Sequence, residues 1–284
     1  MKADCHMHMI LDGFDWKAAI GRHSQAPDMA FIRKTLECYR ALGYTYLRDG
    51  GDRWGAGKMA RQLAPEYGIT YKTPLSPLCR AGHYGAFIGE KYADLGEFAA
   101  LVDKQRSGGA DFIKIMISGL MDFDRFGVLT EEGLPPQEIR QLIHICHEEG
   151  MAVMVHANGA RTVEAAAAAG VDSVEHGAYL DRDALAAMVQ MDVVWVPTLS
   201  TIGNLLGKGR FRQEAVERIL DSALHNVAEF AQMGGMVACG SDAGAWAVWH
   251  GCESEMDWLR RAMAERTEEI TEMSNRVIME RFCR

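Results

Sequence analysis

Short apolar runs rich in β-branched residues alternate along the whole chain with longer segments of helical periodicity. Eight of these runs are predicted to be strands, near residues 3–9, 44–49, 70–76, 111–118, 151–156, 172–176, 193–199 and 236–241. The other segments are predicted to be helices, near residues 28–42, 56–67, 95–106, 135–149, 159–169, 181–191, 211–233 and 253–265, with one more in 266–284. Strands that alternate with helices build parallel sheets, and eight such pairs are what a (β/α)8 barrel needs.

We therefore expect an α/β protein, a single (β/α)8 TIM barrel over residues 1–284. A chain of 284 residues buries enough surface to hold a core without disulfides. The alternative is an open, doubly wound sheet. The count of eight strands favours the barrel, and no G-x-G-x-x-G motif follows an early strand, which disfavours a dinucleotide-binding sheet.

The segment 135–149 illustrates the local signals. Pro135 and Pro136 suit the first turn of a helix, and Gly150 suits the position just after its end. Between them, apolar residues recur at steps of three and four, which is the period of a helix with one buried face.

Charge and composition exclude several classes of function. The chain carries 30 Lys and Arg against 39 Asp and Glu, a formal net charge of −9, which disfavours binding to nucleic acid or to anionic membranes. No apolar run approaches the roughly 18 residues of a membrane span. The first residues lack the apolar core of a secretion signal, so a cytoplasmic protein is expected.

The cysteines suggest how a metal would be held. The seven cysteines include no C-x-x-C pair and are spaced singly, at Cys5, Cys38, Cys79, Cys146, Cys239, Cys252 and Cys283. This pattern fits a reducing compartment and argues against a thiolate zinc site. Imidazole and carboxylate groups would therefore have to bind any metal.

Polar side chains stand at the ends of the predicted strands, where barrels carry their chemistry. His6 and His8 are two apart in the first strand and so face the same side. Lys114 lies in the apolar fourth strand, where it either reaches the strand end to pair with Asp122 or Asp124 or takes part in a site. The fifth, sixth and eighth strands end at His156, His176 and Asp242.

Four imidazoles and a carboxylate on one rim suit zinc better than manganese or iron. Lys114 as an ammonium would repel a cation, so it joins such a site only as a neutral amine or as a carbamate formed with CO₂. A carbamate has the negative charge and the two oxygens needed to bridge two divalent ions. The histidines away from the strand ends are not expected to be ligands: His144, His147 and His225 in predicted helices, and His23 in an early loop.

These residues, together with several longer stretches, resemble the amidohydrolase superfamily, in particular its imidazolonepropionase-like and Xaa-Pro (Xaa-Arg) dipeptidase branch. The resemblance runs from about residue 3 to 282. The stretches that support it are Asp4-x-His6-x-His8, the run around Lys114, residues 155–160, 170–178 and 196–199, Gly240-Ser241-Asp242-Ala243-Gly244, residues 81–85, and His250 with Glu253 or Glu255.

The resemblance implies a zinc hydrolase with two zinc ions per chain. His6 and His8 would bind the buried ion, His156 and His176 the more exposed ion, and carbamylated Lys114 would bridge them. Asp242 would bind metal and move protons, with Asp242 and His176 as the catalytic pair. Members usually carry a small β-sandwich built from both termini, which we expect to be absent or vestigial here.

Substrate contacts are expected from the loops that follow the strands. The candidates are His83, Tyr84, His250, Trp246 and Arg80, with Trp249 beside Trp246 in an apolar wall. The loop 118–134 is long enough to form a lid, and the glycines of 200–212 suggest mobility. Asp242 would take a proton from the attacking water and deliver it to the leaving nitrogen.

The function expected is hydrolysis of a C–N bond in a dipeptide, an acylated amino acid or a cyclic amide. A second reading is a mononuclear, imidazolonepropionase-like ring hydrolase or a related decarboxylase. A third is a non-catalytic barrel that binds a metabolite or a partner, although no expected ligand is missing. The partner expected is a small-molecule substrate, without nucleic acid or membrane, and a homo-oligomer is left open.

Overall fold

The computed structural model describes residues 2–282. Its strands are β1 (Lys2–Met7), β2 (Tyr44–Asp49), β3 (Thr70–Lys72), β4 (Leu78–Arg80), β5 (Glu90–Tyr92), β6 (Ile113–Met116), β7 (Val153–Ala157), β8 (Ser173–His176), β9 (Val194–Val196) and β10 (Met236–Val237). Its α-helices are α1 (Trp16–His23), α2 (Met29–Ala41), α3 (Ala56–Leu63), α4 (Leu95–Ser107), α5 (Pro136–Glu148), α6 (Ala160–Ala168), α7 (Arg182–Gln190), α8 (Ser200–Gly203), α9 (Gln213–Gln232), α10 (Ser254–Met263) and α11 (Thr267–Arg281). Two 3-10 turns, η1 (Ala64–Tyr67) and η2 (Ala264–Arg266), extend α3 and precede α11.

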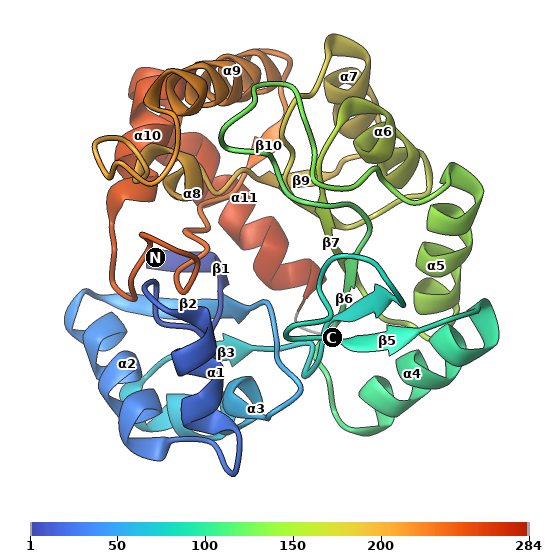
Figure 1. Cartoon of the computed structure of the whole chain (residues 1–284), viewed down its shortest axis with the longest axis vertical. Coiled ribbons are helices and arrows are strands. Elements are labelled where there is room, and N and C mark those ends of the chain that lie inside the picture. The colour runs from blue at the N-terminus through green and yellow to red at the C-terminus, as the bar shows by residue number, and fades with distance from the viewer. Residues whose placement is uncertain (1, 283–284) are drawn as a thin grey trace.

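The strands pair in parallel and form two sheets, one in the order β1-β2-β3 and the other in the order β10-β9-β8-β7-β6-β4-β5. Two seams join them. At one seam the amide of Cys5 donates to the carbonyl of Cys239 at 2.8 Å, and Met7 forms a parallel bridge with Ala243. At the other, the amide of Asp111 donates to the carbonyl of Thr73 at 3.0 Å. The helices surround the strands (Figure 1), which confirms the (β/α)8 barrel.

Each strand predicted for the barrel is present, although most are shorter than expected. The predicted helices are also present, and within 266–284 the expected terminal helix is α11. Four elements were missed: α1, α8, and the pair β4 and β5, which extends the larger sheet. His23, expected in a loop, is instead the last residue of α1 and is buried. Cys283 lies outside the described residues, and the six cysteines within them are free.

The helix signals work as expected in α5. Pro135 is its N-cap and Pro136 its first residue, and the buried positions are Ile139, Leu142, Ile143 and Cys146. Gly150 follows with a φ of +71°, a left-handed conformation that glycine adopts without strain. Other helices begin at aspartates whose carboxylates accept backbone N–H groups, as Asp181 does from Ala184. Within residues 2–282, no helix has both the length and the apolar character to cross a bilayer.

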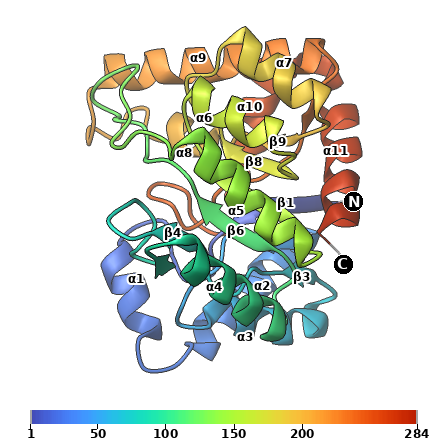
Figure 2. The same ribbon diagram turned by 90° about the vertical axis from the view of Figure 1, so that its right-hand side faces the viewer.

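Helix α11 lies across the lower end of the barrel, against β1, β9 and β10. It is on the side opposite the loop that follows β6 (Figure 2). Beneath the strand ends, the barrel interior is filled by an apolar cluster of Ala3, Cys5, Tyr46, Phe112, Met154, Val194, Val196, Ala238, Ile278 and Phe282. The opposite mouth, at the carboxyl ends of the strands, is where barrels carry their chemistry.

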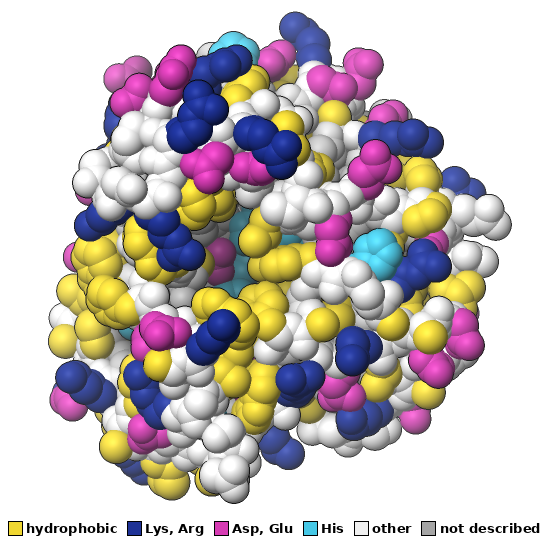
Figure 3. All heavy atoms as spheres, in the orientation of Figure 1, with side chains coloured by type: hydrophobic (Ala, Val, Ile, Leu, Met, Phe, Trp, Pro, Cys, Tyr) yellow, Lys and Arg dark blue, Asp and Glu magenta, His cyan; other side chains and the backbone are white. Residues whose placement is uncertain are grey.

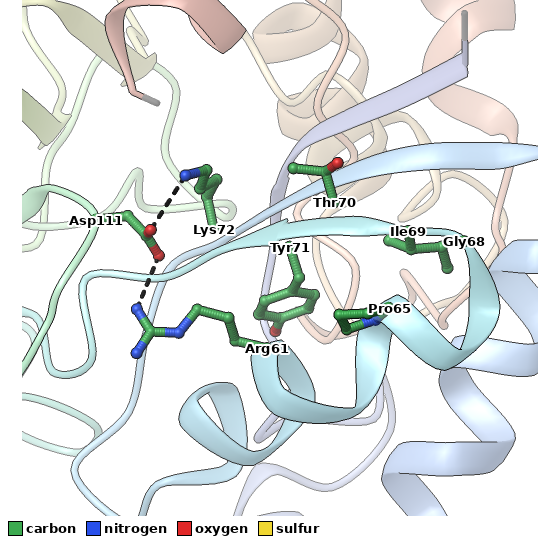
Figure 4. A pocket seen from close by; sticks show the side chains of 8 residues that line it. All are labelled: Arg61, Pro65, Gly68, Ile69, Thr70, Tyr71, Lys72 and Asp111. Atoms are coloured by element: carbon green, nitrogen blue, oxygen red, sulfur yellow. Dashed lines mark hydrogen bonds and ion pairs between the residues drawn. The ribbon is translucent and has the colours of Figure 1, made fainter. Parts of the chain in front are cut away.

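The second seam is held by charge as well as by backbone. Asp111 accepts from the amide of Thr73 at 2.9 Å and pairs with Lys72 at 3.2 Å and Arg61 at 3.1 Å (Figure 4). A cavity of about 480 Å³ lies beside these residues, next to η1 and β3. Since both cations already face Asp111, we interpret this cluster as part of the barrel closure.

We predict that Asp111→Ala lowers the free energy of unfolding by about 1–3 kcal/mol, because it removes the acceptor of the Thr73 amide and the ion-pair partner of Lys72 and Arg61. Urea denaturation measures this. Asp103→Ala is the control, since Asp103 pairs with Arg106 on the exposed surface and should change stability by no more than about 0.5 kcal/mol. Equal effects of the two substitutions would contradict the role given to the seam.

Candidate metal centre

The strand ends bring the six predicted ligands to one mouth of the barrel. His6 lies in β1 and His8 directly after it, Lys114 lies in β6, and His156 lies in β7. His176 ends β8, and Asp242 follows β10. All six are buried or nearly so. In the space-filling view, histidine and acidic side chains are visible at the bottom of a hollow with hydrophobic side chains around its edge (Figure 3).

Three of these side chains form a compact group of donor atoms. His6, His8 and Asp242 each contribute one ligand atom, and these atoms lie within 4.8 Å of one another. His6 Nε2 is 3.3 Å from His8 Nε2. Asp242 Oδ1 is 3.4 Å from His8 Nε2 and 3.6 Å from His6 Nε2. Two imidazole nitrogens and a carboxylate oxygen that face one point match the ligand types zinc takes.

The polar atoms of this group also fit a cation. Asp242 Oδ1 is buried and accepts no hydrogen bond, and His8 Nδ1 likewise has no partner. A buried carboxylate oxygen without a partner is costly unless a cation or donor faces it. Burial, followed by the effect of Lys114, lowers the pKa of His8 to about 3 and that of His6 well below its usual value. Both rings are therefore neutral at pH 7, which is the form that binds metal.

Lys114 lies beside this group. Its Nζ lies 3.3 Å from His6 Nε2. Of the two alternative partners, Asp122 instead pairs with Arg125, and Asp124 accepts from the amide of Arg212. Burial lowers the pKa of Lys114 to about 8, which raises the fraction of neutral amine at neutral pH. The neutral amine is the form that reacts with CO₂.

His156 and His176 lie beside the group, with their ring centroids 4.5 Å apart. His176 is 5.1 Å from His6, centroid to centroid, and its Nδ1 bonds Thr198 Oγ1 at 2.7 Å. His156 Nε2 instead faces the carbonyl of Gly119 at 3.2 Å. The structure thus places both rings next to the group without including them in it.

The backbone at this mouth is strained. His176 has a φ of +71°, Asp242 of +57° and Thr198 of +50°. Each such conformation in a residue other than glycine costs about 1–3 kcal/mol, and such residues cluster at functional sites. Asp242 is held by its amide, which donates to the carbonyl of His6 at 2.7 Å. The strain therefore includes Asp242 of the donor group, together with His176 beside it and Thr198, to which His176 bonds.

Several residues that support the site were not predicted as functional. Asp4 accepts from Ser241 Oγ at 2.6 Å and from its amide at 2.9 Å, which ties β1 to the segment before Asp242. Gly50 leaves room for the His8 ring, since a Cβ there would lie 2.1 Å from His8 Cε1. Arg48 and Glu175 form a buried pair beneath His6. A charged residue inside a predicted barrel strand is the signal that could have found Arg48.

The predicted substrate residues fall into two groups. Tyr84 lies beside His156 with the two rings tilted and their centroids 4.9 Å apart, and the guanidinium of Arg210 lies over Trp246, 4.4 Å from its ring. The polar atoms of the other three already have polar partners in the protein. His83 faces Glu131 at 3.5 Å, Arg80 pairs with Glu138 at 2.7 Å, and His250 bonds the carbonyl of Leu11 at 2.9 Å. The substrate contacts of all five stay predictions.

The loop 118–134 is fastened to its neighbours. Asp124 Oδ1 accepts from the amide of Arg212 at 2.8 Å, and Phe123 packs against Phe211 with centroids 5.2 Å apart. Glu131 accepts from the amide of Tyr84 at 2.9 Å. This loop therefore joins the segment before α9 to the segment after β4 on the site side of the barrel.

A parallel barrel with histidine and aspartate donors at its strand ends is the architecture expected of a metal-dependent barrel enzyme. Comparison with known families agrees with this class. Residues 63–281 match the amidohydrolase family, and the chain belongs to that family. Ochratoxinase from Aspergillus niger is 25% identical over 281 residues, covering 84% of this chain and 56% of the ochratoxinase. The chain thus spans little more than half the length of that relative.

Solved structures resemble this chain over nearly its whole length. A Xaa-Pro dipeptidase with methionine bound in its active site has a TM-score of 0.78 at 19% identity, covering 99% of this chain and 75% of the dipeptidase. The ochratoxinase of A. niger has a TM-score of 0.76 at 21% identity, covering 95% and 68%. These similarities confirm the barrel.

We predict that Gly50→Ala weakens zinc binding at least about 10-fold, because its methyl group displaces the His8 ring. Competition with a chromophoric chelator measures the affinity. Gly21→Ala in α1 is the matched control, since a Cβ there meets no atom within 4 Å. Unchanged zinc affinity in Gly50→Ala would show that His8 is not needed for binding.

Proposed function

We propose that this protein is a zinc-dependent hydrolase of a C–N bond in a small molecule. The observation that carries the proposal is Asp242 Oδ1, buried without a hydrogen-bond partner and facing His6 and His8. Membership of the amidohydrolase family supports it. Relatives described as a Xaa-Pro dipeptidase and as ochratoxinase support a small-molecule substrate.

His6, His8 and Asp242 would hold one ion. His156 and His176 would hold a second, and Lys114, as a carbamate, would bridge the two. Carbamate formation joins the Lys114 nitrogen to CO₂ and releases one proton. Bound zinc supplies a water with a pKa near 7 and polarises the substrate carbonyl.

Asp242 would act as the proton carrier. Its carboxylate lies 3.4 Å from His8 Nε2, and the bond from its amide to the carbonyl of His6 fixes its place, so it would lie next to a metal-bound water. It would take the proton of the attacking water and deliver it to the leaving nitrogen, which otherwise departs as a poor leaving group. His176 is the second proposed catalytic residue, fixed by its bond to Thr198.

The substrate class proposed is a dipeptide, an acylated amino acid or a cyclic amide. Tyr84 and Trp246 would contact its apolar parts, while His83, Arg80 and His250 would have to leave their present partners to reach it. A screen of dipeptides and N-acyl amino acids, with zinc and bicarbonate present, tests the proposal. No turnover of any member by zinc-loaded protein would count against it.

A mononuclear site is the alternative, and one observation favours it. His156 Nε2 is occupied by the Gly119 carbonyl, so the compact donor group consists of His6, His8 and Asp242. A single ion would then serve a ring hydrolase or a decarboxylase, and Lys114 would remain an amine.

We predict that Asp242→Asn lowers kcat about 10²–10⁴-fold on a substrate found in the screen, because the amide cannot carry the proton. Circular dichroism and zinc content check that fold and metal are retained. The control is Asp221→Asn, on the exposed face of α9. A near-normal rate in Asp242→Asn would remove Asp242 from the proton path.

We predict that the protein prepared with zinc and bicarbonate holds about two zinc ions per chain, and that Lys114→Met holds fewer. Elemental analysis after gel filtration gives the count. With ¹³C-bicarbonate, the wild type should show a carbamate carbonyl resonance that is missing from Lys114→Met. One ion in both proteins and no such resonance would favour the mononuclear alternative.

A further inference from the structure

A buried polar network lies beneath His6 and connects three strands. Arg48 on β2 and Glu175 on β8 are both fully buried. Arg48 Nη2 is 2.8 Å from Glu175 Oε1, and Glu175 Oε2 is 2.7 Å from His6 Nδ1. Burying a guanidinium and a carboxylate is costly, so their presence in the barrel interior calls for a role beyond filling space.

The hydrogen bonds determine which atom donates at each contact. Glu175 Oε1 accepts from Arg48 Nη2 and from Ser173 Oγ at 2.6 Å. Arg48 also donates to the carbonyl of Cys5 at 2.6 Å and to Ser173 Oγ at 2.9 Å. A guanidinium has donors only, so the carboxylate of Glu175 faces it as an acceptor. The second oxygen of that carboxylate is left to accept from His6.

His6 therefore carries its proton on Nδ1, and its Nε2 presents a lone pair toward His8, Lys114 and Asp242. The same bond fixes the rotation of the ring. Carboxylates placed behind a ligating imidazole act in this way and raise its basicity.

We propose that Glu175 is a positioning residue that orients His6 and sets its tautomer for metal binding, and that Arg48 holds Glu175 in place for this task. The proposal rests on the proposed function, in which His6 binds zinc. It assigns Arg48 and Glu175 a role in metal affinity, in addition to any role in stability.

Glu175→Gln tests the proposal. The amide has one acceptor oxygen where the carboxylate has two, so its NH₂ group must face a donor, either Arg48 or His6. We expect zinc affinity about 10–100-fold below that of the wild type, measured by competition with a chromophoric chelator. In zinc-loaded protein with ¹⁵N-labelled histidine, the Nδ1–H resonance assigned to His6 should shift or broaden.

Asp52→Asn is the matched control, because Asp52 is also a buried carboxylate, and its oxygens accept from the backbone amides of Trp54, Ala56 and Gly57 at the start of α3. It should lower stability and leave zinc affinity and the His6 resonance unchanged. A reduced affinity in Glu175→Gln alone supports the proposal, whereas equal affinity in Glu175→Gln and the wild type overturns it.

A second variant serves if Glu175→Gln does not fold. The double substitution Arg48→Met with Glu175→Gln leaves no buried unpaired charge and is expected to fold. It also leaves His6 with only a neutral acceptor, so a lowered zinc affinity supports the proposal and a wild-type affinity overturns it. If the wild type itself binds no zinc, the proposed function fails first, and this result is separate from any variant.

Discussion

The closure of the barrel between its first and last strands is the constraint on which the site depends. Three backbone hydrogen bonds make this seam: Cys5 to Cys239 at 2.8 Å, Asp242 to His6 at 2.7 Å, and His8 to Ala243 at 2.7 Å. They alternate along β1 and the residue that follows it, so His6 and His8 are placed in register with the segment that carries Asp242. A different register would move the Asp242 carboxylate away from the imidazoles of His6 and His8.

Hydrogen bonds around the same mouth also support a strained backbone. Asp242 and His176 adopt left-handed φ values that residues other than glycine avoid. Asp242 sits where its amide bonds β1, and the carbonyl of His176 accepts from Trp195 Nε1 at 3.0 Å. These hydrogen bonds thus hold Asp242 and His176 in backbone conformations that would be unfavourable without them. The side chains of both residues therefore stay at fixed positions before any ligand binds.

The sequence predicts the barrel and the strand ends because apolar runs and helical periodicity are strong local signals. It misses β4 and β5, because their sequences, Leu78-Cys79-Arg80 and Glu90-Lys91-Tyr92, contain no β-branched residue. It also gives no sign of the Glu175 contact, because alternation along a strand places neighbours Glu175 and His176 on opposite sides. The positive φ of His176 breaks that alternation, so the side chains of Glu175 and His176 can both face the barrel interior. The Gly119 contact of His156 depends on the course of a long loop, which no local pattern determines.

Charges inside this barrel depend on one another because little water reaches them to screen their fields. Arg48 faces Glu175, Glu175 faces His6, and His6 contacts Lys114. The ring of Phe282, next to α11, lies 4.4 Å from the guanidinium of Arg48. Three side-chain contacts thus connect Phe282, at the lower end of the barrel, to His6 in the donor group. Substitutions of these residues should therefore not have additive effects on the free energy of unfolding. Each group is the partner that compensates for the burial of the next.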